Sequence, residues 1–216
     1  MLKLPHSSRN DLLGYVTLQL ERFFPDGQTD IQQIIDSCLD EALTRLENCI
    51  NCVKMWRSGE FDYLHSSQYT IFLYFLANTL WIKEGNKRIC TKLFLLNKAL
   101  NGIDCFYEIK MPEVFFIGHS VGIVLAKASY GNYLVLYQNS TIGKNHGIAP
   151  ILGDNVILYP NTAVLGSSHV QSGSTISQGC SVINTDTPGN CLVFQENGGK
   201  LTFRPKKEIN DIFFKI

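Results

Sequence analysis

Residues 151–183 read ILGDNVILYPNTAVLGSSHVQSGSTISQGCSVI, and an aliphatic side chain recurs in this stretch at every sixth position. Neither the helical period of 3.6 residues nor the strand period of 2 places an aliphatic side chain so regularly. A hexapeptide repeat does, because each unit forms a short strand and a turn, and three units close one triangular coil. The stretch therefore predicts a parallel β-helix whose inward positions are Leu152, Leu158, Val164, Val170, Ile176 and Val182.

The repeat extends upstream, with one interruption. Glycine, Asn and Asp fill the predicted turns, as tight turns require. Lys144 to Pro150 does not fit the repeat, and we expect it to be a loop extruded from the coil. Before this loop the inward positions are predicted to be Ile117, Ile123, Ser129, Val135 and Thr141.

Charge is distributed unevenly along the 216 residues. The net charge is zero, which excludes the broad basic field of a nucleic-acid-binding protein. Between Val114 and Cys191 only four residues are charged, and this stretch holds ten of the 17 glycines. A β-helix explains the deficit, because its core is aliphatic and its walls consist of small polar residues.

The first hundred residues are typical of packed helices. Apolar residues recur at three- and four-residue steps in 31–46, 69–80 and 89–100, with Gly85 and Gly102 just beyond the last two stretches. After the repeat, residues 192–203 read as a hairpin around Asn197-Gly198-Gly199. We expect an α+β protein with a helical domain (1–108), a β-helix (109–190) and a C-terminal hairpin and tail (191–216).

The compartment is predicted from absent signals. The first residues lack a secretory pattern, and the longest apolar run, Tyr69 to Ile82, is too short to span a bilayer. The seven cysteines are then most simply reduced thiols in the cytoplasm. Cys49 and Cys52 have the spacing of a redox or metal pair, but no second pair completes a site, so we expect no metal.

Three segments carry a resemblance to a known family. GHSVGIVL at 118–125, LYQNSTIG at 136–143 and PILGDNV at 150–156 resemble, in this order, segments of the serine O-acetyltransferases. The resemblance runs from about residue 93 to 193. It implies a left-handed parallel β-helix, acetyl-CoA as acetyl donor, and a homotrimer or a dimer of trimers.

The resemblance also implies a catalytic base. The family's general base corresponds to His119, and an imidazole near neutral pKa suits removal of an alcohol proton. A carboxylate normally orients such a ring. Glu108 takes the place of the family's carboxylate-bearing segment, and Asp104 is the second candidate because its spacing to His119 fits better. The competing interpretation of His119 is a turn histidine without a chemical role.

Two positions depart from the family pattern. Gly118 replaces the Asp that precedes the base, and Ala149 replaces a second active-site His. His146, three residues earlier in the predicted loop, is a candidate substitute. Without the carboxylate, the ammonium group of serine lacks a charged partner.

The acceptor is therefore predicted to be a saccharide hydroxyl, as in the acetyltransferase-like proteins of polysaccharide and capsule assembly. Serine acetylation in cysteine biosynthesis and a non-catalytic scaffold remain alternatives. We expect the helical half either to pair trimers or to dock the protein peripherally at the inner membrane. Aromatic residues are expected to line the acceptor pocket: Phe115, Phe116, Tyr130, Tyr133 and Tyr137. The implied substrate contacts are Tyr137 and Gln138 for the acceptor, and Thr141, Gly143 and Asn161 for acetyl-CoA.

Overall fold

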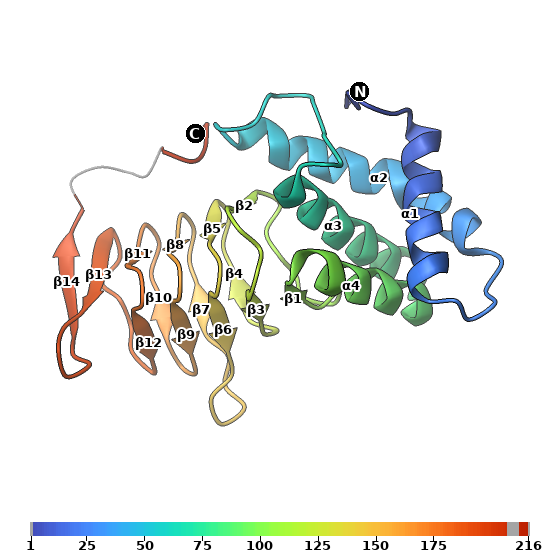
Figure 1. The fold of residues 1–216 in the computed structure, drawn as a ribbon. Coiled ribbons are helices and arrows are strands. Elements are labelled where there is room, and N and C mark those ends of the chain that lie inside the picture. Colours follow the sequence, from blue (N-terminus) through green and yellow to red (C-terminus); the bar gives the residue numbers. More distant parts are fainter. Residues whose placement is uncertain (1, 207–211, 216) are drawn as a thin grey trace.

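The computed structural model describes residues 2–206 and 212–215, and it confirms the predicted class of fold (Figure 1). Helices form the first half of the chain and a parallel β-helix forms the second. The helices are α1 (Arg9–Phe23), α2 (Ile31–Cys52), α3 (Ser66–Glu84) and α4 (Lys87–Asn101).

Local signals set the helix boundaries. Helix α1 begins with a capping box, in which Ser8 and Asp11 each accept a hydrogen bond from the other's backbone N–H. Helices α3 and α4 end as predicted at Gly85 and Gly102, whose φ angles of 61° and 66° suit glycine best. Helix α3 is buried on nearly all sides, so it forms the centre of the helical half.

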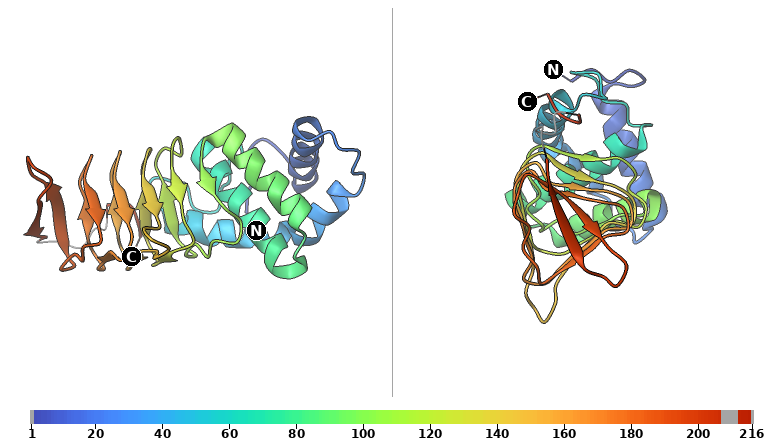
Figure 2. Two further views of the ribbon diagram at one scale, coloured as in Figure 1. Left: turned by 90° about the horizontal axis from the view of Figure 1, so that it is seen from below. Right: turned by 90° about the vertical axis from the view of Figure 1, so that its left-hand side faces the viewer.

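The strands of the β-helix build the three faces of a triangular prism (Figure 2). In the coils directly after the loop, paired positions lie 18 residues apart, as with Ile157 and Thr175 or Ile151 and His169. The five-stranded sheet contains β1 (Asp104–Cys105), β3 (Val124–Leu125), β6 (Thr141–Gly143), β9 (Ala163–Leu165) and β12 (Ser181–Ile183). The three-stranded sheet contains β4 (Ser129–Tyr130), β7 (Ile151–Leu152) and β10 (His169–Val170). The six-stranded sheet contains β2 (Phe115–Ile117), β5 (Leu134–Leu136), β8 (Ile157–Leu158), β11 (Thr175–Ile176), β13 (Cys191–Gln195) and β14 (Leu201–Pro205).

The inward ladder is confirmed from residue 152 onward, where all six predicted aliphatics are buried. Upstream of the loop Ile117 is confirmed, since it pairs with Leu136, and Ile123 is buried, but the predicted positions 129, 135 and 141 are wrong by one residue. The positions that pair with Leu152, Leu158 and Val164 are Tyr130, Leu136 and Ile142 rather than Ser129, Val135 and Thr141. The reason is the loop, because paired positions across it lie 22 residues apart instead of 18, as with Ser129 and Ile151.

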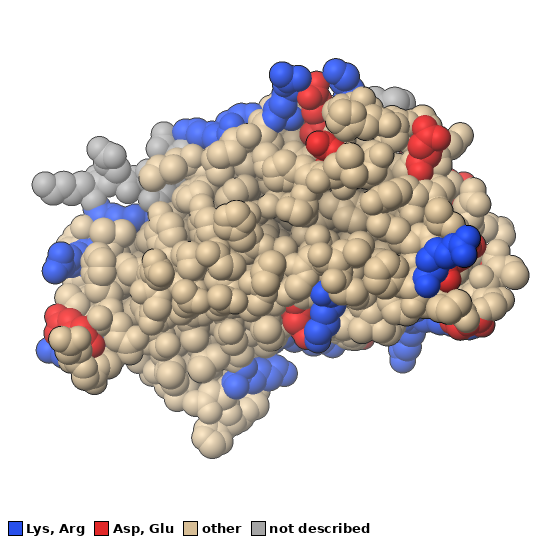
Figure 3. All heavy atoms as spheres, viewed as in Figure 1, with Lys and Arg blue, Asp and Glu red and all other residues tan. Residues whose placement is uncertain are grey.

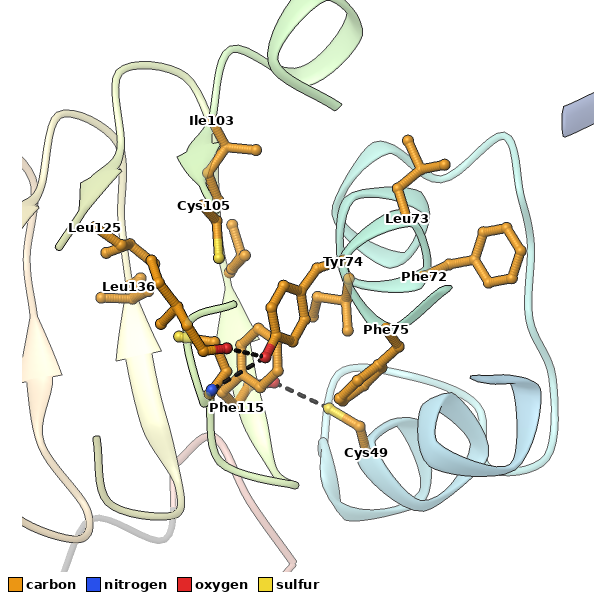
Figure 4. Close-up of a cluster of buried hydrophobic side chains, with 14 of the residues drawn as sticks. Cys49, Phe72, Leu73, Tyr74, Phe75, Ile103, Cys105, Phe115, Leu125 and Leu136 are labelled. Carbon is orange, nitrogen blue, oxygen red and sulfur yellow. Dashed lines mark hydrogen bonds between the residues drawn. The ribbon is translucent and has the colours of Figure 1, made fainter. Parts of the chain in front are cut away.

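Both ends of the β-helix are covered, which prevents open strand edges from pairing with other chains. At the first end Phe115 packs edge-on against Tyr74 and Phe75 of α3 (Figure 4). The Tyr74 hydroxyl accepts a hydrogen bond from the N–H of Met111 (3.0 Å) and donates one to the carbonyl of Ile109 (2.7 Å). At the other end β13 and β14 form an antiparallel hairpin.

The C-terminal segment, residues 212–215, lies back beside the helices rather than beyond the hairpin (Figure 1). Phe214 forms an antiparallel bridge with Val53, directly after α2. Residues 207–211 of the predicted tail lie outside the described residues. None of the described helices is long and apolar enough to cross a membrane.

Close stacking of the coils yields a stability prediction. A Cβ atom on Gly131 would lie 2.5 Å from the backbone nitrogen of Asp154 in the next coil. We expect Gly131→Ala to lower the free energy of unfolding by about 1–3 kcal/mol through overpacking. The control is Gly14→Ala, which meets nothing within 4 Å in helix α1 and should raise stability by about 0.5–1 kcal/mol. Denaturant unfolding measures both, and equal effects would contradict the prediction.

Candidate active site

His119 lies at the corner where the chain passes from the six-stranded to the five-stranded sheet. Its neighbours are held by the helical half: Ser67 at the start of α3 donates a hydrogen bond to the carbonyl of Gly118 (3.1 Å), and Ser120 donates one to the carbonyl of Asn101 (2.6 Å). The imidazole itself is exposed, and its ring lies 6.4 Å from that of Tyr137. The backbone is therefore fixed while the imidazole remains accessible to a substrate.

Tyr137 occupies the space above Gly118. A Cβ atom on residue 118 would lie 2.7 Å from Cδ1 of Tyr137 and closer still to Cε1. A side chain at position 118 would thus require Tyr137 to move. The glycine next to His119 is consistent with the close approach of this ring.

Tyr137 belongs to an aromatic cluster that the sequence only partly revealed. Its ring stacks on Tyr159 at 5.6 Å and meets Phe213 edge-on at 6.2 Å. Burial, together with the nearby Tyr159 hydroxyl, raises the pKa of Tyr137, so its phenol is neutral near pH 7. Tyr159 and Phe213 were missed because no motif marks them; only the stacking of coils and the returning C-terminus bring them here.

Of the other predicted pocket aromatics, Phe116 belongs to this cluster, where it meets Tyr137 edge-on at 6.5 Å, and the remaining three lie elsewhere. Phe115 and Phe116 are buried, Tyr130 is the inward residue of its coil, and Tyr133 packs edge-on against Phe214. The Tyr130 hydroxyl donates a hydrogen bond to the carbonyl of Ala126 (2.6 Å). Of the five, Tyr137 alone has a ring contact with His119 within the described residues.

Both candidate carboxylates form ion pairs with lysines. Asp104 stands on the five-stranded sheet, paired in register with Val124, and accepts from Lys98 Nζ at 2.6 Å. Glu108 pairs with Lys127 near the opposite edge of that sheet, where both border a surface cavity of about 500 Å³. Neither carboxylate has a hydrogen bond to His119 in the described structure.

His146 lies at the tip of the extruded loop, which is confirmed. Asn145 and Ile148 exchange two backbone hydrogen bonds (2.9 and 3.0 Å), and both His146 and Gly147 have positive φ. The loop leaves the corner between the five- and three-stranded sheets, whereas His119 lies at the other edge of the five-stranded sheet. Within one chain the structure therefore separates the two histidines. Ala149 borders the same cavity as Glu108.

The residues predicted to contact acetyl-CoA lie along one wall of the β-helix, the five-stranded sheet. Thr141 and Gly143 belong to β6 of the five-stranded sheet, and Asn161 lies at the His119 corner, where it accepts a hydrogen bond from Asn139 (2.9 Å). Leu165 packs closely against Gly143: a Cβ atom added to Gly143 would lie 2.7 Å from Cδ2 of Leu165. At the same corner Gln138 has a buried Oε1 without a hydrogen-bond partner in the described structure, which leaves an acceptor for a ligand or water.

Among the described residues, no group of three His, Cys, Asp or Glu side chains could hold a metal ion. Cys49 is buried and donates its S–H to the carbonyl of Phe115. Burial raises the pKa of Cys49 to about 12, so it stays a protonated thiol. The Cys49–Cys52 spacing is thus a feature of the interior face of α2.

Comparison with known proteins shows which enzymes this chain is similar to in sequence. No family model matches the chain. The serine acetyltransferase of Synechococcus elongatus is 30% identical over 122 residues, covering 52% of this chain and 48% of that protein. The serine acetyltransferase of Staphylococcus epidermidis is 26% identical over 98 residues. The chain spans about half the length of the curated relatives it matches.

The structural similarity to serine acetyltransferases covers more of this chain than the sequence similarity does. Serine acetyltransferase from Brucella abortus superposes with a TM-score of 0.72 at 17% identity and covers 95% of this chain and 86% of its own. That from Vibrio cholerae gives 0.71 at 16% identity and covers 94% and 83%. At such identity these structures show the fold alone. The fold is that of the hexapeptide-repeat β-helix acetyltransferases. The predicted resemblance to serine O-acetyltransferases is confirmed.

Proposed function

We propose that this chain is an acetyl-CoA-dependent O-acetyltransferase with His119 as its general base. The observation that carries the proposal is an exposed imidazole on a backbone corner that two serine hydrogen bonds hold in place. In the reaction His119 takes the acceptor's hydroxyl proton as that oxygen attacks the thioester carbonyl. The new C–O bond replaces the C–S bond, and the proton passes to the departing thiolate.

The orienting carboxylate is better assigned to Asp104 than to Glu108. Asp104 lies under β3, the strand that begins five residues after His119, whereas Glu108 lies near the corner from which the loop emerges. Lys98, which pairs with Asp104, would have to release it. Such an exposed ion pair stabilises the fold by only about 0–1 kcal/mol. Exchanging it for a hydrogen bond between Asp104 and the imidazole would therefore cost little free energy.

The donor would lie along the five-stranded sheet. Thr141 and Gly143 stand on this wall one coil above His119, and Asn161 stands at the corner one coil further. This path supports the predicted acetyl-CoA contacts. The strands β3, β6, β9 and β12 carry no charged side chain, so the wall suits the uncharged pantetheine arm better than its phosphates.

The same wall supports a homotrimer. Val124 and Ile183 are 44% and 46% exposed on it, and the middle of the β-helix carries few charges (Figure 3). Since His119 and His146 lie at opposite edges of the five-stranded sheet, they can act together only if a second copy supplies one of them. Pairing of trimers and a cytoplasmic location stay predictions.

L-serine is the first acceptor to consider, because the relatives are serine acetyltransferases; the comparisons favour it over a polysaccharide. The second candidate is a neutral hydroxyl compound such as a saccharide. The contact between Tyr137 and Gly118 favours it, because this contact places an uncharged ring where a charged partner for an ammonium group would be needed.

Removal of the base tests the mechanism. We expect His119→Ala to lower kcat/KM for CoA release by about 10²- to 10⁴-fold while acetyl-CoA binding persists. His169→Ala, which changes a histidine on the three-stranded sheet, is the control and should keep full activity. Unchanged turnover in His119→Ala would remove His119 from the mechanism. Absence of both turnover and acetyl-CoA binding in the wild type would favour the scaffold alternative.

A panel of acceptors separates the two candidate substrates. Thiol release from acetyl-CoA is measured with L-serine, with nucleotide sugars and with oligosaccharides. We expect release with L-serine, on the strength of the sequence relatives. Release with a saccharide and none with L-serine would instead establish the second candidate.

The mass in solution tests the assembly. We expect three or six times the chain mass of 24.3 kDa by light scattering. Val124→Asp should shift the protein to the mass of one chain, because it buries a charge in the proposed interface. Leu18→Asp, a matched change at an exposed leucine of α1, should leave the mass unchanged. A wild-type protein with the mass of one chain would exclude the trimer.

A further inference from the structure

The C-terminal segment, residues 212–215, is attached to the end of helix α2. The N–H of Lys54 donates to the carbonyl of Phe213, and the N–H of Lys215 donates to the carbonyl of Cys52, both at 2.8 Å. The Lys215 ammonium also donates to the hydroxyl of Ser58 (2.7 Å). Two backbone hydrogen bonds around one bridge fix the segment's register, and so decide which side chain faces the β-helix.

Phe213 is the side chain that reaches the site. Its ring lies 5.7 Å from Phe116 and 6.2 Å from Tyr137, and it is only 6% exposed. Tyr137 in turn is the ring beside His119. Phe214 points elsewhere, against Tyr133 at 5.4 Å, and is 1% exposed, so it serves as the segment's anchor.

Tyr137 depends on this support. Gly118 leaves room for the ring on one side and Tyr159 stacks against it. Phe213 meets it edge-on, at an interplanar angle of 68°. Phe116 also meets the Tyr137 ring edge-on (6.5 Å), but Phe116 itself packs against Phe213, so loss of the Phe213 ring would loosen both contacts with Tyr137. No hydrogen bond of the Tyr137 hydroxyl to a described residue holds this ring in place. Edge-to-face aromatic pairs of this kind are favourable beyond the area that they bury.

We propose that Phe213 is a positioning residue: it holds Tyr137 beside His119 and thereby sets acceptor binding without touching the reacting atoms. This proposal rests on the proposed function only in one respect, which is that Tyr137 is taken to be part of the acceptor-binding site. The C-terminal segment thus completes a site whose base belongs to the first coil, and Phe116, packed between Trp56 and Phe213, links it to the helical half.

The experiment combines kinetics with a probe of Tyr137. Phe213→Leu keeps an apolar side chain but removes the ring, and Phe213→Tyr restores a ring. The matched control is Phe94→Leu, which removes a ring from an aromatic pair with Phe106 in the helical half (5.4 Å). Each protein is labelled with 3-fluorotyrosine, and the Tyr137 signal among the nine tyrosines is assigned from Tyr137→Phe.

We expect Phe213→Leu to shift or broaden the Tyr137 fluorine signal and to raise the acceptor KM about three- to tenfold, with the acetyl-CoA KM within twofold of wild type. The acceptor probe is L-serine, or the saccharide of the panel that supports turnover. Phe213→Tyr should retain both wild-type properties, and Phe94→Leu should change neither.

Two results would overturn the proposal: a Tyr137 signal that Phe213→Leu leaves unchanged, or a rise in the two KM values together, which a general loss of structure would produce. The fluorine signal needs no turnover. If no acceptor is acetylated the proposed function fails, while the support of Tyr137 by Phe213 is still decided by the spectrum.

Discussion

The hydrogen bonding of each coil to the next is the constraint on which the rest of the structure depends. Strands of two or three residues cannot persist alone, so each is stable only because a strand of the neighbouring coil pairs with it over a shared aliphatic ladder. Stacking also aligns the corners. The N–H groups of Asn139 and Asn161 each donate to a carbonyl in the preceding coil, and the N–H of Gly122, three residues after His119, donates to the carbonyl of Gly102 at the end of α4.

Such a stack of coils must be covered at both ends, and the elements that cover the first end also contact the candidate active site. Helix α3 covers the first coil through Tyr74, Phe75 and Phe115, and its first residues hold the carbonyl of Gly118. The C-terminal segment joins the end of α2 and supplies Phe213 to the same region. Elements that serve to bury the first coil therefore also position the candidate base and its aromatic neighbour.

Prediction from sequence succeeded where the physics is local and periodic. The six-residue ladder from Leu152 to Val182, the helix ends at Gly85 and Gly102, and the extruded loop all follow from spacing or turn chemistry. The register before the loop could not be predicted, because counting by six across an insertion of unknown length loses one residue, and Tyr130 turned inward where Ser129 was expected. Tyr130 also left the predicted pocket for this reason, since a one-residue shift moves a side chain to the other face.

The sequence by itself determined the β-helix, its helical partner and the chemical candidate His119, because repeats and motifs are properties of neighbours along the chain. Only the tertiary structure decided what surrounds that histidine. Tyr137 lies beside it and packs against Tyr159 and Phe213, which come from two other parts of the chain. Asp104 and Glu108 form ion pairs with lysines instead. These contacts depend on coil stacking and on the returning C-terminus, which bring together residues that no spacing in the sequence connects.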